Sequence, residues 1–203
     1  MTPRILTVAS LTALLWLVWI ADLLWPGSVS ILGYGIVPRT SFGLRGIVVA
    51  PFIHASLQHL IANTIPVLIL GGLVVLRGVR TFAYVAFLAA LVAGLGTWLF
   101  GTGNAQHVGA SGVVFGFFGY LLLRTIFDRR LTSALVTLLV AALYGATMLS
   151  SLMPAEGVSW SGHLFGFLGG VAAARTGSPT ARSSSRFPPP PPPPRAGSAA
   201  RSS

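Results

Sequence analysis

The sequence predicts an all-α membrane protein, a bundle of six transmembrane helices, and three observations support this fold class. Only 8% of the 203 residues are charged, whereas soluble domains carry about 25%. Hydrophobic residues make up 54% of the chain and gather in six apolar runs. Each run has roughly the 20 residues that a helix needs to cross a bilayer. Since backbone amides cannot stay unpaired in hydrocarbon, runs of this length are expected to be helices.

The first predicted span covers residues 5–25. A secretory signal peptide would have a shorter apolar run and a clear small-residue cleavage site after it. Neither feature is evident, so we expect a retained helix. The other five spans are separated by segments with charges, glycines or prolines, and they cover residues of about 57–76, 82–100, 111–127, 131–149 and 158–174.

A longer connection, residues 26–56, separates the first two spans. It contains Gly, Pro and two Arg, together with an apolar piece at residues 47–53. This piece is too short to cross a bilayer. We expect it to lie at the membrane interface or to dip into it.

Arginine placement predicts the orientation of the bundle. The chain has thirteen Arg, no Lys and only three acidic residues, a balance that raises the question of a nucleic-acid partner. Eleven Arg fall on the side of the N-terminus, and only Arg39 and Arg45 fall on the other. Cytoplasmic segments of membrane proteins carry such an excess. Both termini are therefore expected in the cytoplasm, no nucleic-acid partner is expected, and the tail Arg can contact anionic lipid.

The composition divides the chain into a membrane domain, residues 1–175, and a tail, residues 176–203. The tail is rich in Ser, Arg and Ala and contains seven consecutive prolines at residues 188–194. Such a run forms polyproline II and can dock into an aromatic groove. We favour the simpler interpretation, a disordered cytoplasmic tail, because a proline run alone specifies no partner.

Uncharged polar residues inside the spans are the candidates for function, because a polar group in lipid is costly unless it is paired or used. The second, fourth and sixth predicted spans run in one direction and begin at the non-cytoplasmic face. His59 and Asn63 lie near the start of the second span. Ser111 begins the fourth span, and His163 lies near the start of the sixth. All four side chains are therefore expected at similar depth under one leaflet.

Each of these residues has an ordinary explanation when taken alone. A Ser in a membrane helix usually bonds to its own backbone, and a His or Asn often only joins two helices. Local geometry favours a site, because His59 and Asn63 share one helix face. Ser111 follows a Gly-rich loop at a helix N-terminus, where an anion is stabilised. Glycines at four-residue spacing, which let helices approach closely, occur in spans four and six at Gly112, Gly116, Gly162, Gly166 and Gly170.

This set of residues suits nucleophilic attack on an amide or ester carbonyl. His163 would take the Ser111 proton as general base and return it to the leaving amine. His59, Asn63 and the Ser111 amide would donate hydrogen bonds to the oxyanion of the tetrahedral intermediate.

Other hydrolase designs are excluded by the residue inventory. The three acids are Asp22, Asp128 and Glu156, and none is placed to orient His163, so a dyad is expected in place of a triad. The chain has no Cys and no His-Glu-x-x-His zinc motif. It also has no pair of membrane Asp and no Gly-x-Ser-x-Gly elbow. No cofactor and no metal are expected.

Three motifs resemble those of the rhomboid family of intramembrane serine proteases, and the resemblance covers residues 45–175. The first is the His-x4-His-x3-Asn pattern of His54, His59 and Asn63. The others are Gly-x-Ser-Gly around Ser111 and Gly-His-x2-Gly-x3-Gly around His163. The resemblance implies oxyanion contacts from His59 and Asn63. It also implies supporting roles for a further set, namely His54, Phe115, Gly109, Gly112, Gly162 and Gly166.

Two positions depart from the family pattern. Leu44-Arg45 stands where the first long loop of the family commonly carries Trp-Arg. Phe115 stands where a Tyr often stacks on the catalytic base. Phe keeps the aromatic face and loses only the hydroxyl, so activity is expected to survive.

The resemblance implies a multi-pass protein of the bacterial plasma membrane that cleaves transmembrane helices near their extracytoplasmic ends. Its partners would be membrane-protein substrates and the lipid bilayer, and the sequence leaves its oligomeric state open. One alternative is a catalytically silent relative that binds membrane clients, although such proteins usually lack the Ser or the His. Another is a transporter or channel, which would need polar residues along a route through both leaflets.

Overall fold

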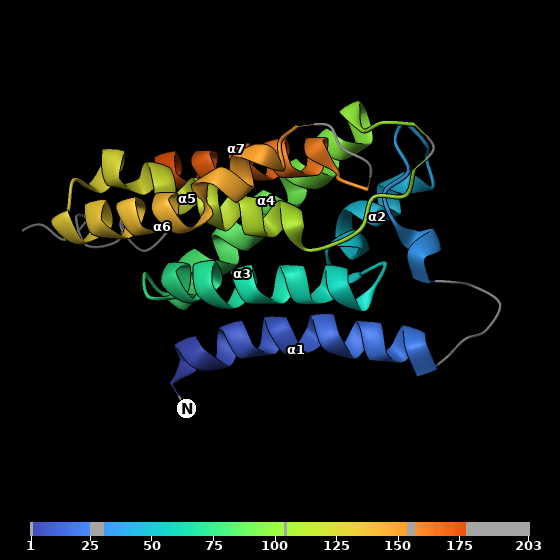
Figure 1. Cartoon of the computed structure of the whole chain (residues 1–203), viewed down its shortest axis with the longest axis horizontal. Helices are drawn as coiled ribbons and strands as arrows, with labels where there is room; N and C mark the ends of the chain where they lie inside the picture. The colour runs from blue at the N-terminus through green and yellow to red at the C-terminus, as the bar shows by residue number, and fades with distance from the viewer. Residues whose placement is uncertain (1, 25–30, 104, 154–156, 178–203) are drawn as a thin grey trace, which may run out of the picture.

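The computed structural model describes residues 2–24, 31–103, 105–153 and 157–177, and within these ranges it is helical. Figure 1 shows the arrangement of the elements. The α-helices are α1 (Pro3–Leu24), α2 (Gly43–Val49), α3 (Leu57–Val75), α4 (Val79–Phe100), α5 (Ser111–Asp128), α6 (Leu131–Ser150) and α7 (Trp160–Thr176). Two short 3₁₀ turns, η1 (Ile31–Tyr34) and η2 (Ala50–Phe52), lie in the first long connection. The proline-rich tail predicted from the sequence lies outside the described residues.

Five of these helices are long and apolar enough to cross a membrane, and they are α1, α3, α4, α5 and α6. Their bounds agree with the predicted spans to within about one helical turn. The predicted sixth span corresponds to α7, which has 17 residues. An all-helical membrane bundle is thus confirmed, and the count of six spans stays a prediction.

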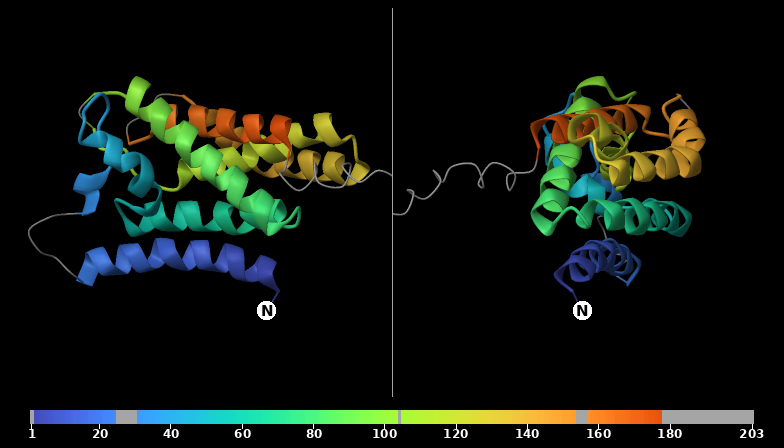
Figure 2. Two further views of the ribbon diagram at one scale, coloured as in Figure 1. Left: turned by 180° about the vertical axis from the view of Figure 1, so that it is seen from behind. Right: turned by 90° about the vertical axis from the view of Figure 1, so that its left-hand side faces the viewer.

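The helices alternate in direction, as the predicted topology requires. In Figures 1 and 2, α3, α5 and α7 begin at the end of the molecule where α2 lies, and α1, α4 and α6 begin at the opposite end. The starts of α3, α5 and α7 therefore lie at one end, which brings the candidate polar residues to similar depth.

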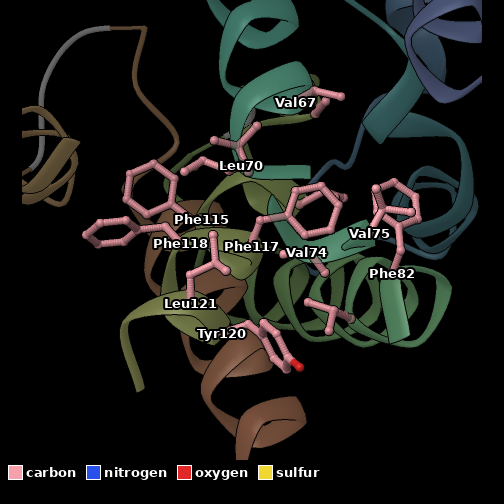
Figure 3. Packing of buried hydrophobic residues seen from close by; sticks show 14 of the residues in the cluster. Val67, Leu70, Val74, Val75, Phe82, Phe115, Phe117, Phe118, Tyr120 and Leu121 are labelled. Atoms are coloured by element: carbon pink, nitrogen blue, oxygen red, sulfur yellow. The ribbon is translucent and has the colours of Figure 1, made fainter. Parts of the chain in front are cut away.

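Helix α5 is the centre of the bundle and packs against α3, α4, α6 and α7. The crossing of α5 and α7 is close because glycines face each other across it. A Cβ on Gly166 would collide with the backbone of Gly112, and one on Gly170 would collide with Gly116. On its other side α5 builds the apolar core, in which the Phe117 ring lies 5.1 Å from the Phe82 ring (Figure 3).

Helices α1 and α6 lie at the periphery. Helix α1 packs mainly on α3 and buries only Val8 and Leu15. It stands beside α3 in both views of Figure 2. One hydrogen bond ties the pair, from Trp16 Nε1 to Thr64 Oγ1 over 3.1 Å. Helix α6 packs mainly on α5.

The first long connection contains α2 and η2, and the short apolar piece predicted at residues 47–53 falls within them except for its last residue, Ile53. Its anchor is on α4. Trp98 Nε1 donates to the Thr40 carbonyl over 2.8 Å, and Arg39 N donates to the Trp98 carbonyl over 2.9 Å. The Arg39 guanidinium also donates to two carbonyls at the end of α4, those of Leu99 and Gly101. Trp98 of α4 thus anchors the connection, which carries Leu44 at the position where the family commonly has a Trp.

The end of α5 opposite Ser111 holds an ion pair. Arg77 donates to the Asp128 carboxylate over 2.6 Å, and Ser133 Oγ donates to the same oxygen over 2.8 Å. Helix α5 has 18 residues, so this carboxylate lies about 25 Å along the helix from Ser111. Asp128 therefore joins the α3–α4 connection to α5 and α6 and lies too far from Ser111 to take part in a triad.

Candidate active site

Ser111 is the first residue of α5 and is half-buried. Gly109, two residues earlier, has φ of +111°, a conformation that an L-residue with a side chain rarely adopts. Its N–H donates to the Ala50 carbonyl of η2 over 2.9 Å. Ala110 caps the helix without a side-chain hydrogen bond. The Val113 amide donates to the Ala110 carbonyl over 2.9 Å, whereas the amides of Ser111 and Gly112 have no acceptor among the described residues. These two amides are therefore available to an anion.

His59 and Asn63 of α3 face the backbone of this turn. Ser56 caps α3 by accepting from His59 N over 3.1 Å, which places His59 in the first turn of the helix. A Cβ on Gly109 would lie 2.6 Å from the imidazole of His59 and 3.7 Å from Asn63 Nδ2. The Asn63 amide also donates to the His59 carbonyl over 2.9 Å. Both predicted oxyanion residues therefore lie beside the loop that leads into Ser111.

His163 of α7 is only 8% exposed and is held from two directions. Its ring stacks on that of Phe115, with centroids 4.2 Å apart and planes 7° from parallel. Its Nδ1 lies 2.8 Å from the Ser151 carbonyl oxygen. Because a carbonyl only accepts, Nδ1 carries the proton in this bond, and Nε2 is left with its lone pair in the neutral ring.

The glycines predicted to support the site bring α5 and α7 together. Gly112 and Gly166 meet backbone to backbone, and a Cβ on Gly162 would lie 3.0 Å from Ser159 Oγ. Phe115 is one turn after Ser111, so its stack on His163 places the imidazole beside the first turns of α5. Within the described residues the Ser111 hydroxyl makes no hydrogen bond, and direct contact between Ser111 and His163 stays a prediction.

His54 lies between η2 and α3 and is 3% exposed. Its ring packs edge-on against that of His59, with centroids 5.2 Å apart. Both of its ring nitrogens lack a hydrogen-bond partner within the described part of the chain. Burial lowers the pKa of His54 to about 4, and the neighbouring His59 adds to the effect. His54 therefore packs against the His59 ring as a neutral imidazole.

A Rhomboid domain matches residues 42–180, more than half of the chain. The chain belongs to the rhomboid family. It is similar to an uncharacterized protein of Mycobacterium tuberculosis, with 39% identity over 83% of this chain and 72% of that protein. An uncharacterized protein of Mycobacterium leprae matches at 39% identity, over 83% and 69%. YdcA of Bacillus subtilis, named provisionally as a rhomboid protease, matches at 26% identity over 83% and 85%.

Membership in the rhomboid family assigns the chain to a family of intramembrane proteases. Its apolar helices make it a multi-pass membrane protein, and these relatives are all bacterial. No group of three or more His, Cys, Asp or Glu that could hold a metal ion occurs among the residues described.

In this rhomboid, hydrogen bonds near the candidate site also involve residues that the sequence did not mark as part of it. Those in question are Arg39, Trp98, His107, Ser151 and Ser159. Ser151 acts through its backbone carbonyl, which leaves no trace in sequence. His107 could have been singled out, because it is the His closest in sequence to Ser111.

Proposed function

We propose that this rhomboid is an intramembrane serine endopeptidase that uses a Ser111–His163 dyad to cleave transmembrane helices near their extracytoplasmic ends. One observation carries the proposal. The start of α5 is flanked by His59 and Asn63 at Gly109 and by His163 at Phe115. A nucleophile, a base and two hydrogen-bond donors are the parts that acyl transfer requires.

In the proposed reaction, Ser111 Oγ attacks the carbonyl carbon of the scissile amide while His163 Nε2 takes the hydroxyl proton. The tetrahedral intermediate collapses as the imidazolium returns that proton to the leaving nitrogen, and the C–N bond breaks. Water then attacks the acyl ester, with His163 again accepting and returning a proton. The Ser151 carbonyl performs the orienting part of the Asp in a triad, because it holds the Nδ1 proton.

The oxyanion would be bound by hydrogen bonds from His59, Asn63 and the Ser111 amide. Support comes from the closeness of His59 and Asn63 to Gly109 and from the amides of Ser111 and Gly112, which have no acceptor within the described part of the chain. A helix N-terminus adds a favourable dipole for negative charge. Removing one such donor typically costs about a hundredfold or more in kcat.

The substrate class follows from where the dyad lies in the membrane. Ser111 begins a span and His163 lies in the first turn of α7, so the scissile bond must come near one membrane surface. An amide inside an intact helix is shielded from attack, so the substrate has to unwind locally. We expect small residues at the cleaved bond, as in the family.

Orientation rests on the arginines. Arg4, Arg77 and Arg80 lie toward the end of the bundle opposite Ser111, whereas Arg39 and Arg45 lie on its side. By the positive-inside rule the Ser111 end faces away from the cytoplasm and both termini lie within it. We propose residues 1–175 as the protease domain, followed by a cytoplasmic tail whose residues 178–203 lie outside the described part of the chain.

Cleavage in proteoliposomes tests this function. A tagged single-span reporter with small, helix-destabilising residues near its outer end should be cut by the wild type and not by Ser111→Ala or His163→Ala. Ser151→Ala is the matched control, since it removes the hydroxyl, which donates to the Thr147 carbonyl, but keeps the backbone carbonyl that contacts His163, and it should cleave normally. Cleavage by Ser111→Ala would contradict the mechanism. Binding of the reporter by the wild type without cleavage would favour the client-binding alternative.

A further inference from the structure

His107 lies in the connection between α4 and α5, four residues before Ser111. Its backbone pairs with that of Ile36 in the first long connection: each N–H donates to the other residue's carbonyl, with N···O distances of 2.9 Å. Its side chain reaches the other way, and Nδ1 lies 2.8 Å from Ser159 Oγ. One residue thus joins the first long connection, the loop before α5 and the start of α7.

Ser159 is the N-cap residue of α7, yet its hydroxyl caps nothing. A Ser at this position normally accepts from an amide of the first turn, an interaction that stabilises a helix by about 1 kcal/mol. Here the hydroxyl is bonded to His107 instead. The lost cap indicates that this bond has a purpose other than starting the helix.

The start of α7 also carries the base. The His163 amide donates to the Ser159 carbonyl over 3.0 Å, so the two residues belong to the same turn. Gly162 leaves room for the Ser159 hydroxyl, because a Cβ there would come within 3.0 Å of it. Movement of Ser159 would therefore move the turn that holds His163.

The His107 ring has little freedom to move. It is half-buried, and a Cβ on Gly101 would lie 3.1 Å from its Nε2. Burial lowers the pKa of His107 below its ordinary value. The ring is accordingly neutral near pH 7, and whichever tautomer is present can bond a hydroxyl.

We infer that the His107–Ser159 hydrogen bond sets the position of the nucleophile loop relative to the start of α7, which makes both residues positioning residues for the Ser111–His163 pair. The inference rests on the proposed function. Reacting groups displaced by about 1 Å can lose roughly a hundredfold in rate. A bond that spans the two halves of the dyad is placed to prevent that displacement.

The test is a double-mutant cycle on the cleavage of the tagged reporter. His107→Leu and Ser159→Ala should each lower kcat by about tenfold or more with little change in KM, because alignment is lost and substrate binding is not. The double variant should be no slower than the slower single variant. His107→Asn, whose amide can occupy the place of Nδ1, should recover much of the rate. Gln106→Ala, an exposed neighbour, should match the wild type.

Several results would overturn the inference. The inference is wrong if Ser159→Ala keeps the wild-type kcat. It is also wrong if the losses of the two single variants multiply in the double variant, or if His107→Asn is as slow as His107→Leu. Thermal unfolding identifies any variant that fails to fold. If the His107 variants do not fold, the kcat of Ser159→Ala alone tests the inference, because this substitution removes only one hydroxyl. An inactive wild type would overturn the proposed function first, and the inference with it.

Discussion

The ring of Phe115 lies parallel to the imidazole of His163, with 4.2 Å between their centroids. This stack fixes the plane of the imidazole, while the Ser151 carbonyl fixes its rotation through Nδ1. The imidazole proposed as the base is thus held at its face by Phe115 and at its edge by the Ser151 carbonyl, without a carboxylate. In soluble serine proteases an Asp performs the second of these tasks.

Replacing Phe115 tests the stack. Phe115→Leu should lower kcat by roughly twofold to tenfold, since an aromatic pair contributes about 0.5–1.5 kcal/mol beyond its buried area. Phe115→Tyr keeps the ring and should remain close to wild type. Reporter cleavage by the purified variants gives both rates. Equal kcat for the Leu and Tyr variants would show that the stack does not hold the base.

Substitutions of two glycines test the close approach of α5 and α7. Gly166→Ala puts a methyl against the Gly112 backbone and should destabilise the protein by about 1–3 kcal/mol, with loss of cleavage. Gly145→Ala in α6 meets nothing within 4 Å and should leave activity intact. Thermal unfolding in micelles, with cleavage measured on the same samples, compares them. A stable, active Gly166→Ala would contradict the tight crossing of α5 and α7.

The sequence predicted the helical bundle well because its signals are local. Apolar length and charge placement alone located α1, α3, α4, α5 and α6. The anchor of the first long connection could not be predicted, because it joins Thr40 to Trp98 across 58 positions and one partner is a carbonyl. A backbone acceptor has the same chemistry whatever its side chain, so no motif marks it.

The anchor of the first long connection gives a third prediction. Trp98→Phe keeps an aromatic ring but removes the Nε1 donor to Thr40, so the loop that bonds to Gly109 should loosen and cleavage should slow. Trp16→Phe removes the corresponding donor of α1, whose acceptor is Thr64 of α3. Both should lose about 1 kcal/mol of stability, but only Trp98→Phe should lose activity. The same cleavage rate in the two variants would refute the role of the anchor.

Acid should destabilise the protein through His54. The pKa of His54 is lowered by burial from 6.5 to about 4, so between these values the unfolded chain binds a proton that the folded chain does not. The stability that the neutral His54 contributes is therefore fully present above pH 6.5 and is lost as the pH falls toward 4. Below pH 4, His54 causes no further change in stability. Unfolding temperatures across this range should fall less steeply in His54→Gln. An equally steep fall of the unfolding temperature in His54→Gln and the wild type would show that His54 does not cause the loss of stability.

The candidate site was predictable only in part. Ser111, His163, His59 and Asn63 stood out because polar residues are rare in these spans and the alternating topology puts them at one depth. Ser159 did not, because a Ser before a helix looks like an ordinary cap. Its actual partner, His107, is 52 positions away in sequence.

The most direct test is the site of covalent labelling by a serine-directed fluorophosphonate, mapped by peptide mass spectrometry. We predict one adduct on Ser111 in the wild type, strongly reduced labelling in His163→Ala, and no adduct in Ser111→Ala. An adduct on another serine, or undiminished labelling of Ser111 without His163, would contradict the proposed dyad.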